Sequence, residues 1–457
     1  MDKPIKHHKM ATESVPKLVI TMSLPPIVSM FIQSMYNVVD SIFVAKISME
    51  ALTAVSLAFP MHMLMVALFV GTGAGISSLI SRKLGEGDYE SASKAANHGF
   101  IINIIYSIII AIIGIFFTDK FVSVFTKDLI LQDLTVQYLR ILLIFSFGNF
   151  ITQAGISILQ STGNTFIPMM TQLVGAITNI ILDPILIFGL LGFPKMGVTG
   201  AALATVIGQL ASFALTMKVV IKDENNLNIT LKNFKPDTKT FKDIFTVGLP
   251  AIIMQSLASI MVSGLNIILI AYSAAAVAVL GIYFKLQSFV FMPIFGLCQG
   301  FRPIMGYNYG AKNKTRVLET YKTAIIISAS IMFAGTLIFQ IFPKHLLMLF
   351  DSNNEMMKIG IKALRIISLT FVPAAFGITI STTFQAFGKG VISLAISFLR
   401  QIVVLLPSAF ILSEFFGLDA IWYSFLISEL AAVLVAVPSL YVYLNATFKS
   451  WNTSANN

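Results

Sequence analysis

The sequence predicts an all-α integral membrane protein with about twelve transmembrane helices in two six-helix lobes. First, only 11% of its 457 residues are charged and 56% are hydrophobic, whereas soluble domains carry about 25% charged residues. Second, apolar runs longer than about 18 residues recur along the whole chain, and each can cross a bilayer as a helix. Third, the two halves of the chain repeat each other at a constant spacing.

The apolar runs give the expected spans in order. They cover residues 18–47, 52–82, 95–117, 131–159, 164–190, 196–221, 242–271, 276–308, 318–342, 355–386, 389–413 and 416–446. Several exceed the length that a bilayer requires, which predicts tilted helices or helices that extend beyond the lipid. We expect no cleaved signal peptide, and the single cysteine, Cys298, excludes an intramolecular disulfide.

Lysine and arginine collect in alternate connecting segments, which predicts the orientation. They crowd the N-terminal tail 1–17, the polar linker 222–241 and the turn 312–316. Cytoplasmic loops of membrane proteins carry this excess, so we expect both termini, including the tail 447–457, in the cytoplasm of a cell that holds the protein in its plasma or inner membrane. The same bias explains the net charge of +10 without any nucleic-acid partner.

The internal repeat has an offset of 225 residues over most of its length. It relates Pro25 to Pro250, Gly71, Gly75 and Gly85 to Gly296, Gly300 and Gly310, Arg140 to Arg365, and Gln160 and Gly163 to Gln385 and Gly388. Near the end the offset falls to 220. We therefore expect an N-terminal lobe at 18–221 and a C-terminal lobe at 242–446. Because each lobe has an even number of spans, the repeat is parallel, as in transporters that alternate access around a central cavity.

Two aspartates within the spans break the repeat. Asp40 corresponds to Leu265, and Asp183 corresponds to Leu406 when the prolines that follow in the fifth and eleventh spans are paired. A charge at the bilayer centre costs about 2.5–3.5 kcal/mol, so such carboxylates must face a wet cavity, share a proton or bind a cation. At 1.5 Å per residue, Asp40 lies roughly 33 Å and Asp183 roughly 28 Å along helices that start on one side, so both fall in the same half of the bilayer.

Polar neighbours extend this pattern. Gln33, Tyr36, Asn37 and Asp40 share one helical face, and Asn179 precedes Asp183 by one turn. This spacing favours a hydrophilic pocket inside the membrane. The alternatives are structural: Asp183 could cap a helix restarted at the next residue, a proline, and Asp40 could hydrogen-bond a neighbouring helix.

The combination resembles the multidrug and toxic compound extrusion (MATE) transporters, close to the bacterial branch of DNA-damage-inducible and staphylococcal multidrug exporters. The resemblance is carried by "SLPPIVSMFIQSMYNVVDSIFVAKI", "LGEGD", "QSTGN", "NIILDPILIFG", "GVTGAALAT" and "GLDAIWYSFLISE". It implies a monomeric exporter in which inward movement of Na⁺ or H⁺ drives the export of cationic amphiphiles, with no bound cofactor. It also implies a cation site built from Asp40, Asn179, Asp183 and Thr205. Gln33 and Tyr36 match the glutamine and tyrosine that precede the first aspartate in that family.

The C-terminal lobe departs from one branch of that family, because the seventh and tenth spans contain no acid. We expect Gln153 and Lys285 to line the cavity with Asn37, although Lys285 could equally pair with a carbonyl group. Arg302, near the cytoplasmic end of its span, is interpreted as an anchor that snorkels. Glu429 lies within a span, so a functional role is possible, but we favour a structural interpretation in which Arg400 neutralises it as a buried ion pair.

Three other functions fit the sequence less well. A flippase for lipid-linked saccharides shares the two-lobed architecture, but its cavity should hold arginines for pyrophosphate rather than acids. An intramembrane aspartic protease would need the two acids within hydrogen-bonding distance and a path for a peptide substrate. A channel would need a ring of equivalent polar residues, which a two-fold repeat does not supply. The sequence therefore favours a transporter, not an enzyme, with lipids and small cationic drugs as its partners.

Overall fold

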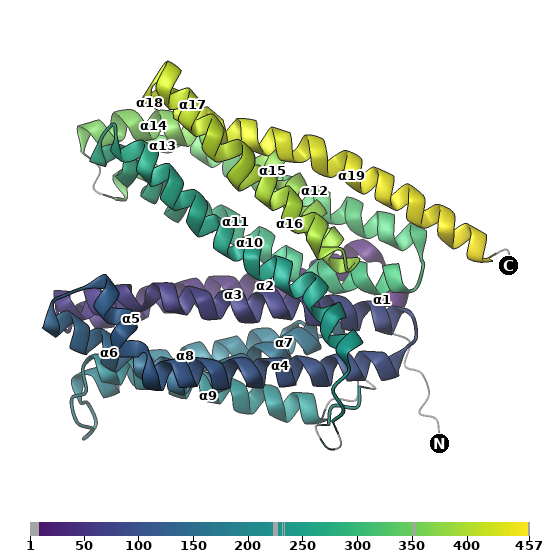
Figure 1. Cartoon of the computed structure of the whole chain (residues 1–457), viewed down its shortest axis with the longest axis horizontal. Helices are drawn as coiled ribbons and strands as arrows, with labels where there is room; N and C mark the ends of the chain where they lie inside the picture. Colours follow the sequence, from purple (N-terminus) through teal and green to yellow (C-terminus); the bar gives the residue numbers. More distant parts are fainter. Residues whose placement is uncertain (1–8, 223–226, 231, 233, 351–352, 456–457) are drawn as a thin grey trace. The chain divides into compact units, whose positions relative to one another are not determined.

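The computed structural model describes the chain except residues 1–8, 223–226, 231, 233, 351–352 and 456–457, and Figure 1 shows its helices. Lys3, Lys6 and part of the predicted linker 222–241 lie outside the described residues. The described part is helical throughout and contains no strand. Its long helices are α2 (Val15–Ala45), α3 (Met49–Gly85), α4 (Tyr89–Phe116), α8 (Phe166–Phe188), α9 (Val198–Lys222), α10 (Thr238–Ile270), α11 (Ala274–Gly310), α12 (Lys314–Ile341) and α19 (Tyr423–Ala455).

Shorter helices complete the chain. They are α1 (Lys9–Thr12), α5 (Thr118–Phe125), α6 (Leu129–Ile144), α7 (Phe147–Ser161), α13 (Pro343–Met348), α14 (Asn354–Ser368), α15 (Phe371–Ala386), α16 (Gly390–Phe398), the π-helical segment η1 (Leu399–Leu405), α17 (Leu406–Phe416) and α18 (Leu418–Ile421). Ten helices of the described chain are long and apolar enough to cross a membrane, and the number rises to twelve if each of two bent pairs is one span. The all-α membrane fold with about twelve spans is confirmed.

The two bent pairs are the fourth and tenth spans, which the sequence predicted as continuous segments 131–159 and 355–386. Helices α6 and α7 meet at 47°, and α14 and α15 meet at 48°. The two breaks fall at residues 145–146 and 369–370. Pro373, four residues after Leu369, has no backbone N–H to donate to the Leu369 carbonyl group, and Gly148 takes the corresponding place in the first half. These residues give a local reason for the breaks, which recur at the offset of 225 residues.

The repeat predicted from the sequence is visible in the helix boundaries. Helices α3 and α4 start and end 225 residues before α11 and α12. The residues that cap helix N-termini recur at the same offset: Ser48 and Ser273 each accept a hydrogen bond from the backbone N–H three residues later, and Asp88 and Asn313 do the same. A side-chain oxygen at this position satisfies a backbone donor that has no partner in the helix.

The chain forms two compact units. One comprises Leu24–Phe245, and the other comprises Met1–Ser23 together with Thr246–Asn457. The first turns of α2 thus belong to the core of the second unit, where Leu18, Val19 and Met22 are fully buried. The start of α10 belongs to the first unit, where the Phe241 ring lies 4.8 Å from the His98 ring.

The described part of the linker is fixed to α4 by side chains. Asn97 accepts a hydrogen bond from the Thr230 backbone and donates one to the Asn228 carbonyl group. His98 accepts a hydrogen bond from the backbone N–H of Asp237 at its Nε2 atom, 2.9 Å away, and its Nδ1 atom lies 2.7 Å from the Lys94 carbonyl oxygen. These contacts require the neutral imidazole with its proton on Nδ1. The linker residues 228–230 and 234–237 are therefore part of the first unit.

Candidate functional site

Close packing of α8 against α9 positions the candidate site in the first unit. Gly175 and Gly208 lie where the helices cross: a methyl group added at Gly208 would be 2.7 Å from the Gly175 carbonyl oxygen and 3.3 Å from the Asn179 Cβ atom. A methyl group at Gly200 would be 2.6 Å from the Leu186 carbonyl oxygen. Small residues at a membrane helix interface allow backbones to approach this closely. The approach brings polar side chains of α9 within reach of those on α8.

A hydrogen-bonded polar group lies beside this crossing. The Asn179 amide donates to Asp183 Oδ1 and to Thr205 Oγ1, both at 3.3 Å. The Thr205 hydroxyl donates to the Ala201 carbonyl oxygen at 3.0 Å. Because the Thr205 proton is used there, the Tyr36 hydroxyl, 3.4 Å away, is the donor in its contact with Thr205. Three helices, α2, α8 and α9, thus contribute side chains to one site.

The site has more acceptors than donors. Among the described residues, Asp40 Oδ1, Asn179 Oδ1 and Asp183 Oδ2 are buried oxygens without a hydrogen-bond partner. Asp183 is fully buried, Asn179 is 2% exposed and Asp40 is 9% exposed. Buried polar atoms without a partner are costly. Carboxylate, amide and hydroxyl oxygens are ligands for hard cations, so a small cation or a proton would satisfy this group.

The two carboxyl groups are near each other. Asp40 and Asp183 interact electrostatically with each other, and the Asn179 amide donates a hydrogen bond to Asp183. Tyr138 on α6, 7% exposed, interacts electrostatically with both acids and with Tyr36. Sequence reasoning missed Tyr138, although it lies directly before the "LRI" triplet that marks the repeat. In the described part of the chain no cluster of three or more His, Cys, Asp or Glu residues could hold a metal ion.

The other cavity candidates are not part of this hydrogen-bonded group. Gln33 and Asn37 are exposed on the same face of α2 as Tyr36, and Gln153 on α7 is half-buried. Lys285 on α11 is exposed, and its ammonium group lies 5.8 Å from the centre of the Phe350 ring, a cation–π contact within the second unit. The proposed cavity roles of these residues stay predictions.

The second unit contains the expected ion pair. Arg400 Nη1 donates to Glu429 Oε1 at 2.8 Å, and the side chains are 24% and 13% exposed. The sequence-based interpretation of these two residues as a pair is confirmed. The pair joins η1 to α19, and Glu429 Oε2 is buried without a hydrogen-bond partner among the described residues.

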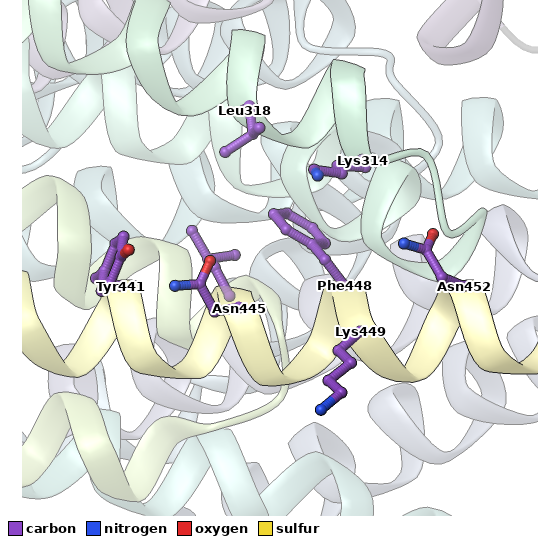
Figure 2. A pocket seen from close by; sticks show the side chains of 8 residues that line it. Lys314, Leu318, Tyr441, Asn445, Phe448, Lys449 and Asn452 are labelled. Atoms are coloured by element: carbon purple, nitrogen blue, oxygen red, sulfur yellow. The ribbon is translucent and has the colours of Figure 1, made fainter.

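A pocket of about 570 Å³ opens between α12 and the C-terminal part of α19. Figure 2 shows Lys314 and Phe448 next to each other, with Asn445 and Asn452 on the same side of α19 and Lys449 extending from the other side. The Lys314 ammonium group is 5.3 Å from the centre of the Phe448 ring. None of the predicted cation-site residues lines this pocket, so it is separate from the site in the first unit.

Comparison with known families identifies the protein. The MatE family model matches residues 25–185 and 250–411, one segment in each half of the chain. The chain belongs to the MatE family. It is therefore a multi-span membrane transporter of the MATE multidrug efflux family, whose members transport small molecules and are not enzymes. The family resemblance seen in the sequence is confirmed.

Individual relatives agree with this assignment. The chain is 28% identical over 434 residues to the multidrug export protein MepA of Staphylococcus aureus (strain MRSA252), covering 94% of this chain and 93% of MepA. It is 28% identical over 442 residues to MepA of Staphylococcus haemolyticus (strain JCSC1435), covering 94% of each.

Solved structures of the superfamily superpose closely on the chain. A multidrug resistance MATE family transporter of the MOP superfamily, in an outward-facing conformation, has a TM-score of 0.90 with 30% identity, covering 98% of this chain and all of that one. A MOP superfamily transporter from Pyrococcus furiosus Vc1 (DSM3638), for which a reversed polarity of the binding pocket is described, has a TM-score of 0.90 with 29% identity over 98% and 99% of the two chains. The two-lobed architecture with twelve spans is confirmed.

Proposed function

We propose that the protein exports cationic amphiphilic drugs by alternating access, in antiport with Na⁺ or H⁺ that binds at Asp40, Asn179, Asp183 and Thr205. The observation that carries the proposal is the excess of buried acceptor oxygens at this site. Asp40 Oδ1, Asn179 Oδ1 and Asp183 Oδ2 are buried without donors, while the donors of Asn179 and Thr205 are already used. We further propose that the protein resides in the plasma or inner membrane with both termini in the cytoplasm.

The coupling follows from the charge of the site. Without a cation, two neighbouring carboxylates repel each other and also attract a cationic drug. When a Na⁺ or H⁺ enters from outside, it neutralises this charge and connects α2 with α8 and α9, which lowers the affinity for the drug. Linkage requires the reverse as well, so the drug weakens binding of the coupling ion by the same factor. Each ligand then favours a different state of the transporter.

Transport of ethidium into inside-out vesicles tests this proposal, with the sodium and pH gradients imposed separately. We expect one of the two gradients to drive uptake by the wild type, and we expect Asp183→Asn to abolish that uptake while the protein remains in the membrane. Asp133→Asn is the matched control, since Asp133 is an exposed aspartate of the same unit. No response of the wild type to either gradient would refute antiport. Full uptake by Asp183→Asn at normal abundance would remove this carboxylate from the mechanism.

A further inference from the structure

The second unit has a charged site in the helices that correspond to the cation site of the first unit. The fifth and sixth spans of the first half are α8 and α9, and those of the second half are α16–η1–α17 and α19. Pairing Pro184 with Pro407 sets Arg400 opposite Ile177, two residues from Asn179. The offset of 220 residues sets Glu429 opposite Gln209, one turn from Thr205. The repeat therefore places the ion pair near the counterpart of the cation site, displaced by two residues from Asn179 on one helix and by four residues from Thr205 on the other.

The two sites differ in what neutralises the acid. In the first unit, three buried oxygens lack a partner, and no basic side chain forms an ion pair with Asp40 or Asp183 among the described residues. In the second unit, Glu429 Oε1 accepts a hydrogen bond from the Arg400 guanidinium at 2.8 Å, and only its Oε2 atom is without a donor. One protein cation thus takes the position that a mobile ion would take in the first unit.

The surroundings of the pair enclose it on the remaining sides. Tyr283 on α11 is 1% exposed and interacts electrostatically with both Arg400 and Glu429. On α15, a methyl group at Gly377 would lie 3.9 Å from Glu429 Oε2. A glycine rather than a larger side chain therefore faces Oε2, and neither Tyr283 nor Gly377 supplies a further basic partner.

A π-helical segment carries Arg400. Arg400 is the second residue of η1, whereas the equivalent helix α8 is α-helical from Phe166 to Phe188. Because π turns have a different number of residues per turn, the segment changes the direction in which the following side chains point. Such segments are rare and occur frequently at functional sites. Here Arg400 lies at the start of the segment, so the ion pair with Glu429 coincides with a departure from α-helical geometry that α8 does not have.

We propose that the Arg400 guanidinium is a fixed cation, which permanently occupies the second unit's counterpart of the cation site. Only the first unit then exchanges an ion, so the number of coupling ions per cycle is set by one lobe. Removing the guanidinium should expose a latent cation site at Glu429. The comparison between units uses the proposed function of Asp40 and Asp183, but the latent site can be tested without it.

The first experiment measures binding of radioactive sodium, and proton uptake on acidification, with purified protein. Asp183→Asn is expected to lose cation binding. Asp183→Asn with Arg400→Met is expected to regain one cation per chain, and adding Glu429→Gln should abolish the gain. A folded Arg400→Met protein that gains neither Na⁺ nor H⁺ binding overturns the proposal, as does a gain that survives Glu429→Gln. If the wild type shows no binding that depends on Asp183, the proposed antiport fails, and the gain is then measured against the wild type.

The second experiment does not depend on the folding of a variant with an unpaired acid. Arg400→Met with Glu429→Gln removes both charges, a replacement that buried ion pairs often tolerate. A fixed cation never leaves the protein, so this double variant should keep the wild-type number of ions transported per ethidium, measured from the gradient at which net flux stops. A changed number would mean that the pair exchanges ions, and would overturn the proposal.

Discussion

Replacing Gly208 by alanine tests whether the close approach of α8 and α9 builds the proposed cation site. The added methyl group would lie 2.7 Å from the Gly175 carbonyl oxygen, whereas ordinary contact begins at 3.4 Å, so the helices must separate by about 0.7 Å. The obstructing atom belongs to the backbone, and no side-chain rotation can relieve the clash. The Asn179–Thr205 hydrogen bond joins the same two helices and is already 3.3 Å long, so it would be lost.

The size of the effect follows from these contacts. Overpacking of this kind costs about 1–3 kcal/mol of folding stability. Loss of one hydrogen bond costs about 1 kcal/mol, which corresponds to a roughly fivefold loss of affinity if it falls on the cation-bound state. We therefore expect Gly208→Ala to raise the Na⁺ or H⁺ concentration for half-maximal ethidium transport by about fivefold.

Reconstituted vesicles with a defined sodium or pH gradient provide the assay, and thermal unfolding in detergent reports stability. Gly281→Ala is the matched control, because no atom lies within 4 Å of its added methyl group. It should leave transport unchanged and alter stability by no more than about 1 kcal/mol, in the stabilising direction. An unchanged cation dependence in Gly208→Ala would refute the argument that the spacing of these helices sets the site.

Three other perturbations have defined outcomes. Arg400→Met should destabilise the protein by about 3–5 kcal/mol in thermal unfolding, and combination with Glu429→Gln should recover most of that loss; equal losses in both variants would contradict a buried pair. Ser273→Ala removes the N-terminal cap of α11 and should cost about 1 kcal/mol, whereas no change in unfolding would show that the cap is dispensable. Asp237 accepts hydrogen bonds from the Thr240 hydroxyl and backbone N–H at the start of α10, and the hydroxyl is the main group that lowers the pKa of Asp237. The stabilisation of α10 by this carboxylate is therefore fully present above the usual aspartate pKa of about 3.9, and it is lost only as pH falls through the lowered pKa. Hydrogen exchange of the Thr240 backbone amide, corrected for its intrinsic rate, should accelerate only in acid. Acceleration near neutral pH would contradict a capping carboxylate with a lowered pKa.

The sequence located the acids through a comparison of the two halves. Asp40 and Asp183 stood out because their counterparts are Leu265 and Leu406. Packing requirements recur in both copies of a repeat, so an acid in only one copy indicates another constraint. The same comparison singled out Glu429, whose counterpart in the first half is the uncharged Gln209. Its pairing with Arg400 could be predicted because an isolated charge inside a bilayer is costly.

Helical spacing predicted the polar neighbours of these acids less accurately. It placed Gln33, Tyr36 and Asn37 on one face of α2, yet only Tyr36 among them hydrogen-bonds to the cation-site residues, through Thr205. Tyr138 was missed because it comes from another helix, α6, and has no acidic or amide residue one turn away. Periodicity describes which residues of one helix share a face, but not which other helix that face meets.

The sequence by itself determined the membrane class, the number of spans and the repeat, because hydropathy and sequence repetition can be recognised without knowing any contact between helices. Only the tertiary structure decided the π segment that carries Arg400 and the crossing at Gly208 that brings Asn179 to Thr205. Those features depend on contacts between helices that are distant in the chain, where distances of a few tenths of an ångström decide which hydrogen bonds form.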